Sequence, residues 1–261
     1  MSLSSPPGSS SSPYDTKSFV VSKNGSGGSI EVKIAEPKLR ADGLTLETWA
    51  SSHILAGFLH SFQINFPSSC LVKNTPDDGN LIPILELGAG TGLVGISAQA
   101  IWGQPAVLTD LEPIIPGIQL NIDLNSSVVE SSGCNVAPKS GTLDWKVPDI
   151  LVLSGGEKVL SCSDSKAHVI LAADTVYSEE QPELLTDVIT RWLSKDREAR
   201  VLIAYPMRVA YLDVIRDLWN RFEEAGLEAV GEGRDTARGD LFDDELLIEW
   251  CLWRWKPELC V

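Results

Sequence analysis

Three glycines at alternate positions, Gly88, Gly90 and Gly92, follow a short apolar run that ends in Glu86 and Leu87. The run predicts a buried strand, and the amphipathic residues after the glycines predict the start of a helix. Glycine lets the backbone approach a ligand without interference from a Cβ atom, and a helix start offers unpaired N–H groups. We therefore expect this turn to bind a ligand with polar ends.

Two classes of cofactor are compatible with the turn. Residues 90–95 match the dinucleotide pattern Gly-x-Gly-x-x-Gly, and Asp110, at the end of the next apolar run, lies at a suitable distance to bind ribose hydroxyls. That pattern is weak alone. Because Glu86 and Gly88 precede it, the full pattern is Glu-x-Gly-x-Gly-x-Gly, which is similar to the first motif of class I S-adenosylmethionine methyltransferases. We favour S-adenosylmethionine and keep a nicotinamide or flavin cofactor as the alternative.

Alternating strand and helix patterns indicate the sheet that must position these residues. The apolar runs predicted to form the main strands are 84–87, 106–110, 141–145, 168–173, 201–205 and 246–255. Helical spacing predicts helices near 45–62, 114–124, 184–193 and 211–222, and a β-hairpin is expected from 19–21 and 30–34. Such alternation requires a parallel sheet with helices on both faces. Residues 125–140 and 151–166 read as loops, although 150–153 could form a short strand.

The bulk properties narrow the class of protein and its setting. Lys and Arg number 21 against 36 for Asp and Glu, so the formal charge of −15 disfavours binding to nucleic acid. The charge suits a basic protein partner, although a solvated acidic surface is the commoner explanation of such a charge. No apolar run approaches the ~20 residues of a membrane span. The five cysteines lack metal-ligand spacing, so we expect no metal site and a reducing, cytoplasmic or also nuclear, location.

The chain reads as one domain with a short tail. Residues 1–13 are mostly Ser, Pro and Gly, without the basic and apolar regions of a signal peptide, and predict a disordered tail. No internal repeat is visible in the remainder. We expect residues 14–261 to form a single domain.

Four segments in order resemble the family-16 seven-β-strand methyltransferases, which are mostly protein-lysine N-methyltransferases acting on chaperones and translation elongation factors. The segments are 85–95, 108–111, Asn121 with Asn125, and 173–177. The resemblance covers roughly residues 44–210, with a family-like strand pair beyond. It implies a Rossmann-like α/β fold whose central sheet is seven-stranded and mostly parallel. It also implies S-adenosylmethionine as cofactor and a lysine of a folded protein as acceptor. We separately expect the protein to be a monomer.

The family's discriminating motif, Asp-x-x-Tyr after the fourth strand, is matched by Asp174 and Tyr177. The resemblance implies that Asp174 orients the incoming amine and that Tyr177 lines the amine channel. A carboxylate can orient an amine and help to dispose of its proton, and an aromatic ring stabilises a nearby cationic nitrogen. Without the rest of the pattern, the two would read as a turn residue and a packing residue.

The resemblance also assigns residues to the cofactor. Those expected at the methionine end are Glu86, Gly88, Ala89 and Gly90, those at the ribose and adenine are Asp110, Leu111 and Trp145, and Trp49 and Ala173 complete the set. Glu86 would anchor nearby backbone or water, Trp49 would close over the cofactor, and Ala173 would contact it through its main chain. Trp49 and Trp145 could equally be core residues, because tryptophan is commonly buried.

Two other functions remain open on this scaffold. One is a small-molecule N-methyltransferase acting on an amine or pyridine, and the other is a non-catalytic protein that keeps the cofactor. Methylation of DNA adenine or protein glutamine is disfavoured, because Thr175 and Val176 stand where those enzymes typically carry two prolines.

Overall fold

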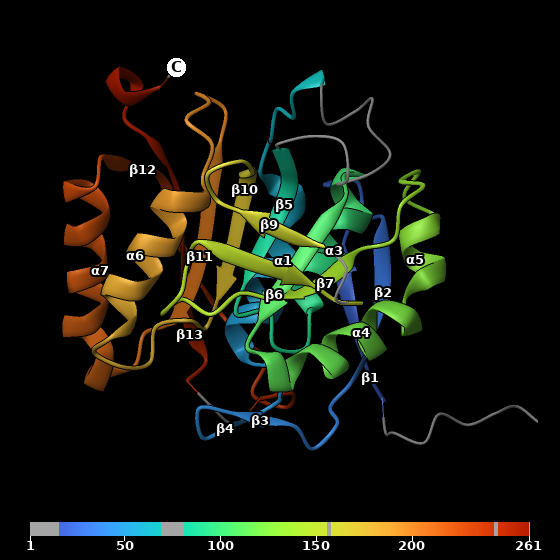
Figure 1. Cartoon of the computed structure of the whole chain (residues 1–261). Coiled ribbons are helices and arrows are strands. Elements are labelled where there is room, and N and C mark those ends of the chain that lie inside the picture. Colours follow the sequence, from blue (N-terminus) through green and yellow to red (C-terminus); the bar gives the residue numbers. More distant parts are fainter. Residues whose placement is uncertain (1–15, 69–80, 156–157, 243–244, 261) are drawn as a thin grey trace, which may run out of the picture.

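The computed structural model describes residues 16–68, 81–155, 158–242 and 245–260 (Figure 1). One sheet of nine strands forms its centre. The spatial order is β12 (Leu227–Thr236), β13 (Leu247–Trp255), β11 (Arg200–Pro206), β10 (Lys166–Ala173), β5 (Leu81–Leu87), β6 (Ala106–Asp110), β7 (Lys139–Thr142), β8 (Ile150–Leu153) and β9 (Val159–Ser161). The predicted tail, residues 1–13, lies outside the described residues.

The middle of the sheet is parallel and both edges are antiparallel. Strands β11, β10, β5, β6 and β7 pair in parallel, while β12 and β13 at one edge and β8 and β9 at the other run antiparallel to their neighbours. The expectation of seven strands is therefore two short. The segment predicted as a loop at 151–166 contributes β9 and most of β8, because its alternating Leu151, Leu153 and Leu160 are buried on one face of a hairpin.

Helices cover both faces of the sheet. The helices are α1 (Ala50–Phe58), α3 (Leu93–Trp102), α4 (Ile115–Leu124), α5 (Ser126–Glu130), α6 (Gln181–Trp192) and α7 (Leu212–Glu224). Consecutive residues of β5 belong to opposite cores: Ile84 packs with α1, α3 and α4, and Leu85 with α6 and α7. Helix α5 corrects the expected loop at 125–140, and the buried side chain of Val129 explains its formation. No helix in these described ranges is long and apolar enough to cross a membrane.

The N-terminal hairpin, β1 (Thr16–Ser22) and β2 (Ser29–Ala35), docks onto α4 through two asparagine side chains. Asn121 Oδ1 accepts a hydrogen bond from the Ala35 N–H at 2.8 Å, and its Nδ2 donates to the Ala35 carbonyl at 3.0 Å. Asn125 does the same with Lys33, at 2.9 and 2.7 Å. The two asparagines lie one helical turn apart and therefore imitate a neighbouring strand along β2. Asn121 Nδ2 also donates to the Thr91 carbonyl at 2.9 Å, which ties the hairpin to the glycine turn.

Candidate active site

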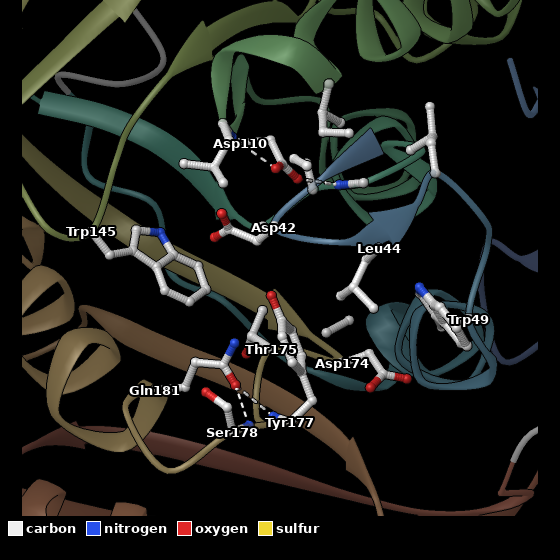
Figure 2. A pocket seen from close by; sticks show the side chains of 18 of the residues that line it. Asp42, Leu44, Trp49, Asp110, Trp145, Asp174, Thr175, Tyr177, Ser178 and Gln181 are labelled. Atoms are coloured by element: carbon white, nitrogen blue, oxygen red, sulfur yellow. Dashed lines mark hydrogen bonds between the residues drawn. The ribbon is translucent and has the colours of Figure 1, made fainter. Parts of the chain in front are cut away.

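A cavity of about 730 Å³ lies at the carboxyl ends of the parallel strands, where open α/β sheets bind their ligands (Figure 2). Its walls come from the segments after β5, β6, β7, β10 and β11 and from residues 41–52. The predicted site residues that line it are Trp49, Gly88, Ala89, Gly90, Asp110, Leu111, Trp145, Ala173, Asp174 and Tyr177. Only Glu86, among the predicted set, does not.

The glycine turn requires glycine at each alternate position. Gly88, Gly90 and Gly92 have φ of 60°, 53° and 81°, in the left-handed region that glycine adopts without steric cost. A Cβ atom on Gly88 would also lie 3.0 Å from Thr175 Cγ2 and 3.3 Å from the Trp145 ring. The missing side chain therefore keeps this end of the cavity open.

Glu86 lies on β5, below the glycine turn, and does not line the cavity. Its side chain is buried, and its Oε2 accepts a hydrogen bond from the Gly95 N–H in the first turn of α3 at 3.0 Å. Burial raises the pKa of Glu86 well above its usual range, against the opposing effect of the Gly95 N–H. The carboxyl group thus fastens the start of α3 to β5 and anchors backbone from below the cavity.

Asp110 holds backbone with both of its oxygens. Oδ2 accepts a hydrogen bond from the Gly90 N–H at 2.8 Å, and Oδ1 accepts one from the Leu111 N–H at 2.7 Å. Burial raises the pKa of Asp110 to about 6, although both N–H groups act to lower it. Each carboxylate oxygen has a second lone pair, so the group can still accept hydrogen bonds from two hydroxyls.

Asp174 is held in a conformation that few side chains adopt. Its φ is +56°, and its N–H donates to the Ala204 carbonyl at 2.9 Å. Ser51 Oγ donates to Oδ2 at 3.3 Å, and Arg208 Nη1 lies 3.5 Å from Oδ1. Asp and Asn tolerate this backbone better than other non-glycine residues, and such outliers concentrate at functional sites.

Tyr177 lies three residues after Asp174, outside any helix, and its backbone is held by Gln181. The N–H groups of Tyr177 and Ser178 donate to Gln181 Oε1 at 2.6 and 2.7 Å. This turn orients the phenol ring along the cavity wall (Figure 2). Burial raises the pKa of the Tyr177 hydroxyl, and the charges of Asp110 and Asp42 add to the effect.

The structure adds residues that sequence reasoning missed. Asp42, with φ of +47°, sits on the turn between β3 (Arg40–Ala41) and β4 (Leu44–Thr45) and lines the cavity. Arg208 follows β11 as Asp174 follows β10, so its place after a predicted parallel strand was a usable signal. Ser51, a single hydroxyl on an apolar helix face, carries no comparable signal.

Thr175 is a further residue of the cavity wall that the prediction passed over. Its side chain is buried, and its Oγ1 finds no hydrogen-bond partner among the described residues. An unpaired buried hydroxyl is costly, so its position beside the open end at Gly88 is the kind expected where a ligand supplies a partner. Within the described residues, no group of three His, Cys, Asp or Glu side chains could hold a metal ion.

The fold and the site together define a class I S-adenosylmethionine methyltransferase. The crystal structure of magnesium protoporphyrin IX methyltransferase from Synechocystis, with bound cofactor, matches at a TM-score of 0.50 and 12% identity, covering 79% of this chain and 80% of that one. The likeness supports the fold alone. The chain belongs to the lysine methyltransferase family, whose model matches residues 29–214.

Two curated relatives agree with this assignment. The protein-lysine N-methyltransferase rrg1 of Schizosaccharomyces pombe is 30% identical over 87% of this chain and 67% of its own length. The protein-lysine N-methyltransferase EFM2 of Saccharomyces cerevisiae is 29% identical over 78% of this chain, which spans 47% of that relative. The family, the fold class and the cofactor predicted from the sequence are thereby confirmed.

Proposed function

We propose that this protein transfers methyl groups from S-adenosylmethionine to a lysine side chain of a folded protein. The observation that carries the proposal is the position of Asp174. Asp174 directly follows β10, the strand next to β5, and lines the same cavity as the glycine turn that follows β5. One cavity therefore has room for a methyl donor and an amine-binding acid.

The residues present fit the cofactor. The turn at 88–90 offers close backbone approach to the methionine end, and Asp110 retains lone pairs for the ribose hydroxyls. Leu111 and Trp145 would enclose the adenine, while Trp49 and the Ala173 main chain would close the remaining sides. When bound, the cofactor supplies a methyl group on a positively charged sulfur.

Asp174 and Tyr177 would receive the acceptor amine. The transfer forms an N–C bond as the S–C bond breaks, S-adenosylhomocysteine is released, and the nitrogen loses one proton to solvent. An enzyme of this kind works mainly by alignment of the two reactants. Asp174 would orient the amine through a hydrogen bond, and the Tyr177 ring would face the nitrogen and exclude water.

The charge around the cavity supports a basic protein segment as the acceptor. The acidic residues in its lining are Asp42, Glu47, Asp110, Asp144, Asp174 and Glu180, and the basic ones are Lys146 and Arg208. This excess matches the net charge of −15 and repels nucleic acid. We place the acceptor among elongation factors or chaperones. We propose that the enzyme is a monomer of the cytoplasm, with the nucleus as a second location.

Radiolabel transfer tests the proposal. The full chain, incubated with methyl-labelled S-adenosylmethionine and a lysate from cells that lack its gene, should label one protein on lysine. Asp174→Gly, which removes the hydrogen-bond acceptor, should abolish the label while calorimetry shows unchanged binding of S-adenosylhomocysteine. Gly is the appropriate variant because it adopts the left-handed backbone at this position without steric cost.

The alternatives give different outcomes in the same assay. Label that passes an ultrafilter below protein size would identify a small-molecule acceptor. Tight cofactor binding with no labelled product would identify a non-catalytic protein. Labelling by Asp174→Gly equal to that by the wild type would exclude Asp174 from the mechanism.

A further inference from the structure

Arg208 places a positive charge beside the acid that is proposed to receive the amine. Its Nη1 lies 3.5 Å from Asp174 Oδ1, and its side chain is about a quarter exposed, with 24% accessible against 5% for Asp174. Arg208 lies two residues after β11, the strand that neighbours β10, and directly precedes the short helix η3 (Val209–Tyr211). The pair is therefore set by the ends of two adjacent strands.

A carboxylate alone is a poor partner for a lysine that must attack. Free lysine has a pKa of about 10.4 and arrives as an ammonium ion, whose nitrogen has no lone pair to donate. A nearby carboxylate favours that charged form further. The same acid that orients the amine thus opposes the loss of the proton on which the transfer depends.

Several other charged or ionisable groups face the cavity from each surrounding element. They are Asp42 and Glu47 on the N-terminal segment, Asp110 after β6, Asp144 and Lys146 after β7, Tyr177 and Glu180 after β10, and Tyr211 after β11. Lys146 lies 3.9 Å from Glu180 at the exposed rim. Of the two basic side chains in the cavity lining, Arg208 is the one that forms an ion pair with Asp174 within the described part of the chain.

We propose that Arg208 is a positioning residue that offsets the charge of Asp174, so that the acceptor lysine is held as a neutral amine. This inference rests on the proposed function. The lysine releases its proton to solvent before the transfer, and the freed lone pair then forms the N–C bond as the C–S bond breaks. Asp174 contributes a hydrogen bond to the amine, and Arg208 lowers the electrostatic cost of deprotonation.

The pH dependence of methyl transfer tests the inference. The acceptor is the protein labelled in the lysate experiment, and the single-turnover rate is measured with excess enzyme and saturating cofactor from pH 6 to 10. At saturation the profile reports ionisations within the enzyme–substrate complex. In Arg208→Gln the midpoint of the rising limb should move up by about one pH unit, as expected for one charge at this range in a partly exposed site. The rate should fall about tenfold at pH 7 and approach the wild-type rate at pH 10.

Two variants serve as controls. Arg208→Lys keeps the positive charge, so its pH profile should have the same midpoint as that of the wild type. Arg216→Gln makes the same change in net charge on the outer face of α7, where Arg216 pairs with Asp213 and is 70% exposed, and should leave the midpoint unchanged. Unchanged binding of S-adenosylhomocysteine shows that each variant is folded.

The possible failures are distinguishable. A rate lowered by the same factor at every pH in Arg208→Gln assigns Arg208 a merely structural role and overturns the inference, while the function stands. A midpoint that moves equally in Arg216→Gln also overturns it, because the effect is then one of net charge. A wild-type enzyme that methylates no lysine at any pH overturns the proposed function and this inference with it.

Discussion

Asp110 Oδ2 accepts a hydrogen bond from the Gly90 N–H at 2.8 Å, so the end of β6 holds the glycine turn that follows β5. The glycine turn and the acid that ends β6, the two predicted cofactor motifs, are thus joined by a hydrogen bond before any ligand binds. The bond orders the turn in advance, which lowers the entropic cost of binding. Asp110 consequently serves both the shape of the turn and the proposed contact with ribose.

Cofactor affinity should depend on the ionisation of Asp110. Burial raises the pKa of this group to about 6 in the free protein, above the usual 3.8. Ribose hydroxyls donate to the charged form, so binding releases a proton from the protonated fraction and becomes weaker as the pH falls below 6. We expect the Kd for S-adenosylhomocysteine, measured by calorimetry, to rise about tenfold between pH 7 and pH 5.

Asp110→Asn provides the control for that titration. The amide cannot ionise, so the variant should bind more weakly and show a flat profile between pH 5 and 7. A wild-type profile as flat as that of Asp110→Asn would contradict the assignment of Asp110.

Gly95→Ala should destabilise the protein strongly. A Cβ atom there would collide with the Glu86 carboxyl group and lie within 2.9 Å of two Leu108 side-chain carbons. Overpacking of this kind costs about 1–3 kcal/mol in the free energy of unfolding. Urea denaturation measures the loss. Gly57→Ala in α1 is the matched control, because its Cβ would meet open space, and it should be neutral or stabilising by up to ~1 kcal/mol.

Asn121→Ala should loosen the N-terminal hairpin. The change leaves the N–H and carbonyl of Ala35 and the carbonyl of Thr91 without their side-chain partner. Unpaired buried groups of this kind cost about 1–3 kcal/mol each, so we expect a loss of at least ~2 kcal/mol. Hydrogen exchange should accelerate at the Ala35 amide, whereas Asp123→Ala, on the exposed face of α4, should change neither quantity measurably. Unaltered protection of Ala35 in Asn121→Ala would count against the docking role.

The left-handed backbone at Asp174 should reverse the usual order of stability between glycine and alanine at this position. Because φ is +56°, Asp174→Gly should be more stable than Asp174→Ala, the reverse of the order expected on an ordinary helix or strand. The difference should be about 1 kcal/mol, the typical cost of a left-handed conformation for alanine. Thermal unfolding of the two variants measures it, and neither should transfer a methyl group. Equal stability would mean that the turn relaxes when its side chain is lost.

Local patterns predicted the central architecture well. The predicted strand 106–110 has the observed bounds of β6. The glycines at 88–92 and the run before Asp174 lie where their apolar flanks predict. The antiparallel strands β8 and β9 at the edge of the sheet were less predictable. Residues 151–166 are rich in Ser and Gly, and their β-hairpin forms only because β7 offers an edge with which β8 can pair.

The sequence by itself determined the turn and the strand ends that carry Asp110, Asp174 and Tyr177, because short-range spacing encodes such local structure. Its resemblance to the lysine methyltransferase family indicated the family and the cofactor class. Only the tertiary structure decided which groups surround Asp174. Ser51 lies 123 residues from it and Arg208 lies 34 residues away, so no local periodicity relates them. Their meeting depends on the spatial order of the strands in the sheet, which places β11 beside β10, and on how α1 packs against that sheet.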